Sequence, residues 1–402
     1  MDLQAQPNDL DDVRRAAIAK AEQAQSFWSI VWEQLLGHKA AILGLIVIGF
    51  FILAALLAPV ISWVTGLDPE TQNPLARYAQ PFTTSALSSE NREDLVTQFQ
   101  NTHPELAAQI RKEIADRQLT TILREDDALF DLANKEPEDQ KQIVAQLQTP
   151  GSGELKKLFQ TFGTYHVFGT DELGRDVLIR LIYGTRVSMG VGILVALTSA
   201  LIGLLVGALA GFYGGWVDTI LMRTTDTLLS LPTMPILIVV SAISVDKIPG
   251  LRALITESNE NILKLVFILV LFSWMTVARL VRAEVLSLRE REFVLAARTL
   301  GAKSRTILFK HLFPNVIAPL LVSVTLGIGE SIQWEAALSF LGLGIQQPTP
   351  SWGNMLFNAQ DLITEAPLLA MLPGILILLV TISFNYLGDG LQDAINPKAI
   401  RR

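Results

Sequence analysis

Long stretches without charge constrain this chain most, because crossing the roughly 30 Å hydrocarbon core of a bilayer as a helix takes about 20 apolar residues. Four uncharged stretches come close to or exceed that length: 40–64, 187–217, 227–245 and 366–388. Two more are less clean, since 265–278 is short and 316–344 contains Glu330 and Glu335. A buried helix of a soluble protein explains one such stretch but not four. The sequence therefore predicts an all-α integral membrane protein with about six transmembrane helices.

Composition excludes several other classes of protein. Half of the 402 residues are hydrophobic and 18% are charged, against about 25% charged in typical soluble domains. The net charge of −7 offers no basic face for nucleic acid. Because the chain has no cysteine, disulfides, thiolate metal sites and a cysteine nucleophile are excluded. The histidines are scattered without metal-ligand spacing, so no metal site is predicted; they are His38, His103, His166 and His311.

Charge in the connecting segments predicts the orientation. Residues 279–315 carry eight Lys or Arg, whereas residues 345–365 carry none. The positive-inside rule places the first segment in the cytoplasm and the second outside. With six spans, both termini then lie in the cytoplasm, and the protein is a multi-pass membrane protein; the bacterial inner (plasma) membrane is implied by the family resemblance described below. The segment 246–264, with three basic residues, is an exception that would lie outside.

The predicted organisation places a large insertion outside the membrane. An interfacial helix is expected at Phe27–Leu36, where Trp28 and Trp32 share an apolar face; the alternative is an amphipathic helix packed on protein. Residues 86–158 are dense in charge, which indicates a helical insertion serving either as a solvated cap or as a docking surface. The expected segments are the N-terminus 1–39, the first span 40–64, the external loop 65–186, the five-helix transmembrane core 187–388 and the tail 389–402.

Glycine and proline positions add details to the spans. Glycines recur every four residues in the second stretch, at Gly203, Gly207, Gly211 and Gly215. That spacing lets two helix backbones approach closely. Pro232 and Pro235 in the third stretch and Pro373 in the sixth are expected to kink or interrupt their helices.

The basic segment from Glu290 to Asn315 is the most informative. A helix should end at Gly301, because glycine suits the left-handed cap position. A second helix is expected to begin near Lys303 and to stop before Pro314. Two short helices joined by a glycine turn form a basic knob, suited to docking into a cleft of another protein.

This segment resembles the coupling motif of ABC importer permeases: Glu-Ala-Ala, three residues, Gly, nine residues, Ile, one residue, Leu-Pro. Four residues fall in register, namely Ala296, Ala297, Gly301 and Pro314. Leu295, His311 and Phe313 replace the usual Glu, Ile and Leu. Residues 168–188 and 336–353 are similar to segments of oligopeptide, dipeptide and nickel permeases. The resemblance covers residues 27–77 and 161–397 and is to the C-type subunit, whose first external loop is usually much shorter.

The resemblance implies a non-catalytic subunit that forms half of the pathway for peptides or related small solutes. Its partners would be a homologous second permease, two ATPase subunits, an external substrate-binding protein and membrane lipid. ATP and Mg would be bound by the ATPases, leaving no cofactor in this chain. The segment Glu292 to Pro314, including Ala296, Ala297 and Gly301, would sit in an ATPase groove and transmit its closure to the spans.

Charged residues near the spans give further candidate sites. Asp171 and Arg175 have the i, i+4 spacing of an ion pair on a helical turn. With Asp176, they are expected at the outer interface, holding the entry helix or taking part in gating. Glu330 and Glu335 are candidates for lining the pathway, because an ionisable group inside a span is costly. Alternatively, a bend near Gly327 and Gly329 leaves Glu335 close to the outer surface.

Two other functions are alternatives to the importer subunit. A secondary transporter would need a proton or sodium site, for which Glu330 and Glu335 are the intramembrane candidates, but it would not need a coupling loop. A membrane-anchored enzyme would place its active site in the insertion 86–158, which has no Ser-His-Asp pattern and no metal cluster. The coupling motif favours the importer subunit.

Overall fold

The protein is described from a computed structural model. The structure describes residues 27–72, 76–85, 164–241, 260–357, 359, 363 and 366–395. The predicted insertion at 86–158 therefore lies outside the described residues, as do most of the segment 246–264 and residues 396–402 of the predicted tail.

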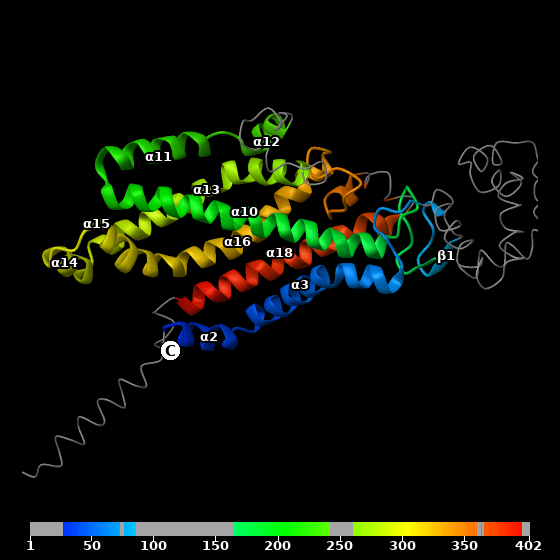
Figure 1. Cartoon of the computed structure of the whole chain (residues 1–402), viewed down its shortest axis with the longest axis horizontal. Helices are drawn as coiled ribbons and strands as arrows, with labels where there is room; N and C mark the ends of the chain where they lie inside the picture. The colour runs from blue at the N-terminus through cyan, green and yellow to red at the C-terminus, as the bar shows by residue number, and fades with distance from the viewer. Residues whose placement is uncertain are drawn as a thin grey trace, which may run out of the picture.

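Long apolar helices run side by side along the length of the molecule (Figure 1). They are α3 (Lys39–Thr65), α10 (Val177–Tyr213), α13 (Glu260–Arg289), α16 (Phe313–Phe340) and α18 (Pro367–Ile395). Each belongs to a segment long and apolar enough to cross a membrane, which gives five spans, or six with the bent pair described next. The predicted all-α integral membrane fold is confirmed.

The third predicted span is a broken one. Helix α11 (Gly215–Leu229) and helix α12 (Thr233–Ser241) meet at 87° across a short break. Pro232 lies in that break and Pro235 in the first turn of α12, where the N–H that proline lacks would have no helical partner anyway. The predicted interruption is thus confirmed here. Pro373, in contrast, lies inside α18 without interrupting it.

Glycines allow α10 and α13 to pack at very short range. A Cβ atom added at Gly203 would lie 2.6 Å from Cβ of Val277, and one added at Gly211 would lie 2.9 Å from the carbonyl oxygen of Arg282. Gly207 faces the Ala278 carbonyl even more closely. The predicted close approach is confirmed for these glycines. Gly215 was wrongly included, because α10 ends before it and nothing lies within 4 Å of its added Cβ.

Two shorter elements flank the bundle. Helix α2 (Phe27–Gly37) packs Val31 and Leu35 against Ala394 of α18, while Trp32 on the same helix is 54% exposed. Strands β1 (Thr83–Ser85) and β2 (Thr164–His166) pair antiparallel, with Thr83 opposite His166. The strand pair thus brings residues 83–85, which follow α3, beside residues 164–166, which precede α10.

Candidate functional site

The predicted basic knob lies at the end of the bundle opposite β1 (Figure 1). Helix α14 (Glu292–Thr299) ends in a left-handed turn at Gly301, whose φ is +79°. The Gly301 N–H donates to the Arg298 carbonyl and the Ala302 N–H donates to the Ala297 carbonyl, both at 3.0 Å. These are the paired hydrogen bonds of a Schellman cap. The predicted helix end at Gly301 is confirmed.

The second helix of the knob does not stop before Pro314, and that prediction was wrong. The chain passes from α15 (Ser304–Thr306) through the π-helical segment η3 (Ile307–Leu312) directly into α16. Proline inside an α-helix removes one hydrogen bond and its ring meets the carbonyl four residues earlier. Here Pro314 occupies the first turn of α16, and the wider turns of η3 precede it. The knob is therefore continuous with α16.

One face of the knob is buried against the bundle. Val294, Ile307 and Leu312 pack with Val281 and Val285 of α13 in one hydrophobic cluster. Helices α14 and η3 share this cluster with α13 and α16. A displacement of the knob would therefore also displace the ends of α13 and α16 that pack against it.

The other face of the knob is exposed and apolar at its tip. Leu300 is 87% exposed beside Gly301, and Phe309 is also exposed. The same segment carries four exposed basic residues, Arg298, Lys303, Arg305 and Lys310. Of the predicted contact residues, Glu292, Ala296, Gly301 and Pro314 are exposed, whereas Ala297 is buried beneath them. Such a surface suits an apolar pocket with an acidic rim.

A buried ion-pair network lies at the opposite end of the bundle, ahead of α10. Asp171 Oδ2 accepts a hydrogen bond from Arg175 Nε at 2.7 Å, and Asp171 Oδ1 accepts from the Arg175 N–H at 3.0 Å. Arg180 Nε lies 3.2 Å from the same Oδ2 as an ion pair, although its angle does not make a hydrogen bond. The predicted Asp171–Arg175 pair is present. The pair lies in a turn ahead of the helix and not on a helical turn as predicted, because α10 begins only at Val177.

Asp176 connects α10 to the strand pair. Its Oδ1 accepts from the Ile179 N–H at 2.9 Å, which caps the helix. Its Oδ2 lies 2.7 Å from His166 Nδ1, and both side chains are buried. Sequence reasoning did not pair these residues, since nothing in their spacing indicates that β2 lies over the start of α10.

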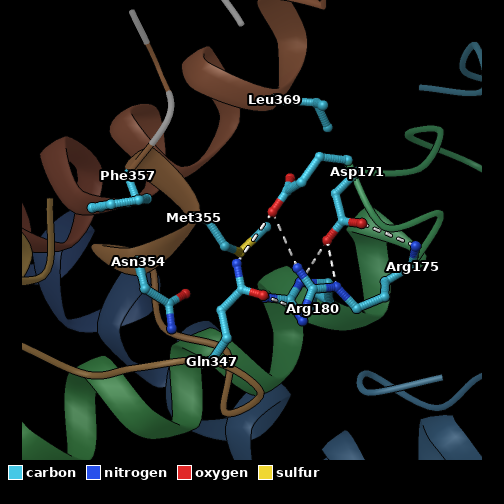
Figure 2. A pocket seen from close by; sticks show the side chains of 9 residues that line it. Asp171, Arg175, Arg180, Gln347, Asn354, Met355, Phe357 and Leu369 are labelled. Carbon is cyan, nitrogen blue, oxygen red and sulfur yellow. Dashed lines mark hydrogen bonds and ion pairs between the residues drawn. The ribbon is translucent and has the colours of Figure 1, made fainter. Parts of the chain in front are cut away.

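The same network reaches segments far away in the sequence. Arg175 Nη1 donates to Gln347 Oε1 at 2.9 Å, and Arg180 Nη1 donates to the Pro69 carbonyl at 3.0 Å. Figure 2 shows the side chains of Asp171, Arg180 and Gln347 around a cavity of about 20 Å³, which is room for about one water molecule. The network therefore fastens three segments together, and the space between its side chains is too small to hold a solute.

The two predicted intramembrane carboxylates occupy different environments. Glu335 is fully buried; its Oε2 accepts from Ser188 Oγ at 2.8 Å and its Oε1 from Ser339 Oγ at 2.9 Å. Ser188 Oγ in turn accepts from the Trp352 N–H at 3.1 Å. Glu335 thereby ties α10, α16 and the segment after α16. Helix α16 continues through Gly327 and Gly329, where a bend was the alternative expectation. Glu335 is buried where α10 packs against α16.

Glu330, five residues earlier, lines a cavity of about 350 Å³. The walls of this cavity come from α10, α13, α16 and the bent pair α11–α12. Within the described part of the chain, no group of three or more His, Cys, Asp or Glu is placed to hold a metal ion. The cavity is bordered by four parts of the bundle, and Glu330 is its charged residue among the described lining.

Comparisons with known proteins agree with this arrangement. Residues 203–401 match the family model of the binding-protein-dependent transport system inner membrane component. Residues 26–81 match the model of the N-terminal TM domain of oligopeptide transport permease C.

Individual relatives align over 233 residues, which is 58% of this chain and 72% of each relative. A dipeptide transport system permease protein of Alkalihalophilus pseudofirmus is 41% identical. A glutathione transport system permease protein of Escherichia coli is 40% identical, and an oligopeptide transport system permease protein of Bacillus subtilis is 37% identical. None of these matches supports the alternative of a secondary transporter.

Proposed function

The chain belongs to the family of inner membrane components of binding-protein-dependent transport systems, and from this premise we propose that it forms half of the pathway of an ATP-driven importer for peptides or related small solutes. It is a multi-pass permease subunit of such a system. Peptides are proposed because relatives of this chain are named as dipeptide and oligopeptide permeases. In this proposal a homologous permease completes the pathway, and a binding protein delivers the solute from outside.

The exposed tip of the knob carries the proposal for coupling. Two ATPase subunits bind ATP and Mg, and one of them receives the tip around Leu300 and Gly301 in a groove. Glu292, Ala296 and Pro314 are proposed to contact the groove wall, while Ala297 supports the cap from beneath. Closure of the ATPases shifts the knob only if the contact differs between the two states, since only differential contacts move an equilibrium.

The orientation follows from this docking. The knob and both termini lie in the cytoplasm, and the strand pair lies on the external side, where residues 86–158 form the external insertion. We propose that Asp171, Arg175 and Asp176 anchor the outer end of α10 rather than gate the pathway, because their partners are buried and their cavity holds about one water. Glu330 is proposed to line the pathway. Glu335 is proposed to hold α10 against α16.

Reconstitution tests the proposal. The chain, its second permease and both ATPases are placed in proteoliposomes, and uptake of labelled trialanine is measured with the binding protein outside and ATP inside. Uptake is expected only when every component and ATP are present. Leu300→Asp is expected to abolish ATP-driven uptake without changing membrane insertion, because it places a charge at the apolar tip. Transport by the chain alone without ATP would refute the assignment.

A matched variant controls for surface charge. Phe82→Asp places the same charge on another exposed apolar side chain, directly before β1 and at the end of the bundle opposite the knob (Figure 1). Its ATP-driven uptake is expected to stay within about 2-fold of the unmodified chain. An equal loss in both variants would show a general effect of added charge and would remove the support for the knob as the coupling element.

A further inference from the structure

A single carboxylate stands in an otherwise uncharged cavity. The cavity of about 350 Å³ between α10, α13, α16 and the α11–α12 pair is within the size range of small-molecule sites. Among the described residues that line it, Glu330 is the one with a charge. A carboxylate in a membrane-spanning segment is costly, and a group kept there defaults to a functional role.

Glu330 is poorly satisfied by the protein itself. Within the described region its hydrogen-bond donor is Trp334 Nε1 at 3.5 Å, the outer limit for such a bond. Glu335 on the same helix shows the contrast, because hydroxyl groups of Ser188 and Ser339 donate to it at 2.8 and 2.9 Å. The Glu330 oxygens therefore retain free acceptor capacity toward the cavity.

A second polar residue of the cavity is Ser199, whose side chain is buried. Ser199 is 2% exposed, and its hydroxyl makes no hydrogen bond within the described part of the chain. Ser199 lines the same cavity as Glu330. Since the Ser199 oxygen itself is enclosed by protein, a molecule in the cavity meets the exposed carboxylate of Glu330 rather than this hydroxyl.

The remaining walls favour a cation. Phe272 and Trp334 contribute aromatic side chains, and Ser273, Thr276 and Ser323 contribute hydroxyl groups. Aromatic faces attract ammonium groups, and a carboxylate makes its strongest hydrogen bonds with charged donors. An anionic group would meet the Glu330 charge without a compensating cation in the described lining.

We propose that this cavity binds a protonated primary amine of the transported solute, with Glu330 as its counter-ion. The inference rests on the proposed function and adds to it the chemical class that this half of the pathway recognises. A peptide presents such a group at its N-terminus or on a lysine side chain, and these two sources share the same chemistry.

The absence of cysteine in this chain makes the local charge measurable. Ser323→Cys places the chain's single thiol on the cavity wall, two turns before Glu330 on α16. In the full complex in nanodiscs, the thiol is modified with 2-aminoethyl or 2-sulfonatoethyl methanethiosulfonate, and modification of this chain is followed by mass spectrometry. Thr65→Cys, exposed at the end of α3, gives the reference ratio of the cationic to the anionic rate.

The expected size of the effect follows from the helix. Seven residues separate the two side chains by about 10 Å. Even with the dielectric constant of water, a unit charge at that distance changes each rate about 2-fold and their ratio about 4-fold. At low ionic strength, Glu330→Gln is therefore expected to lower the ratio for the cavity thiol of the Ser323→Cys chain about 4-fold or more. Glu330→Asp should retain the high ratio, and Glu33→Gln, exposed on α2, should leave it unchanged.

Peptide probes then test the ligand class. Trialanine, N-acetyl-trialanine and N-acetyl-Ala-Lys-Ala are each tested, without the binding protein, for slowing the modification of this cavity thiol. Protection by trialanine but not by its acetylated form supports the N-terminal ammonium as the ligand, and protection by the lysine peptide supports the side-chain ammonium. Either protection must disappear in Glu330→Gln and return in Glu330→Asp.

Other outcomes overturn the inference. Equal protection by all three peptides, protection by none, or a ratio that Glu330→Gln does not change would each show that the cavity does not select an amine. If ATP-driven uptake of trialanine persists while these tests fail, the amine site alone is refuted. If ATP-driven uptake itself is absent, the proposed function is refuted, and the amine site, which rests on it, is refuted with it.

Discussion

Replacing Gly301 by valine is expected to weaken binding of the ATPase subunits about 5- to 30-fold while the chain stays folded in the membrane. Gly301 has φ +79°, and nothing lies within 4 Å of an added Cβ atom. The penalty is therefore backbone strain rather than a clash. For a residue with a Cβ atom, the left-handed conformation costs about 1–2 kcal/mol, which is a factor of about 5–30 in an equilibrium.

The strain appears in the docking step because the free knob has a way to escape it. Outside the complex, the turn relaxes by giving up the hydrogen bonds from Gly301 to Arg298 and from Ala302 to Ala297. Docking then has to restore the strained turn. The underside at Val294 and Ile307 stays packed on α13, so the loss of a single cap does not unfold the bundle.

The assay compares three forms of the permease pair in nanodiscs, with ATPase binding followed by biolayer interferometry. Gly301→Asn is the matched control, because asparagine tolerates the left-handed region better than other residues. Its affinity is expected to stay within about 3-fold of the unmodified protein. If Gly301→Val binds as tightly as glycine, or if valine and asparagine lose affinity equally, the backbone explanation is refuted.

Two further predictions concern stability. Asp171→Asn leaves Arg175 and Arg180 buried without their carboxylate, which is expected to lower the free energy of unfolding by about 3–5 kcal/mol. The loss is measured as a lower midpoint in thermal unfolding of the purified complex. Glu172→Gln, on the more exposed neighbour, should lower the free energy of unfolding by less than about 1 kcal/mol. An Asp171→Asn midpoint equal to that of Glu172→Gln would refute the anchoring role. Gly203→Leu is expected to separate α10 from α13 and to reduce the folded yield strongly, because its Cβ would already lie 2.6 Å from Val277, whereas Gly190→Leu meets open space. Similar yields from both variants would contradict the close packing.

Hydropathy located the membrane helices from sequence because the bilayer imposes a length. The first span was predicted at 40–64 and α3 covers Lys39–Thr65. The family also followed from sequence, since the spacing from Ala296 to Pro314 is local and the family match agrees with it. The cap at Gly301 was predictable for the same reason, because a glycine at that position satisfies the helix end within a few residues.

Hydropathy and length alone did not predict where a helix ends when its last turns carry charged residues. The fourth span was predicted at 265–278, but α13 extends to Arg289. Arg282 Nη2 lies 2.6 Å from Asp218 Oδ2 of α11, a partner that only the packing of the two helices supplies. Similarly, α10 begins ten residues before the predicted start at 187, because Arg180 finds Asp171 and the Pro69 carbonyl.

The two glutamates of α16 separate what sequence determined from what the tertiary structure decided. The sequence alone predicted that Glu330 and Glu335 lie in a membrane-spanning segment, and their spacing of five residues puts them on different faces of a helix. Which face meets a cavity depends on the neighbouring helices. Packing of α10 brings Ser188 onto Glu335 and buries it, while the bend between α11 and α12 leaves space in front of Glu330. Hydropathy is a property of the chain, but the environment of a charge is set by residues far from it in sequence.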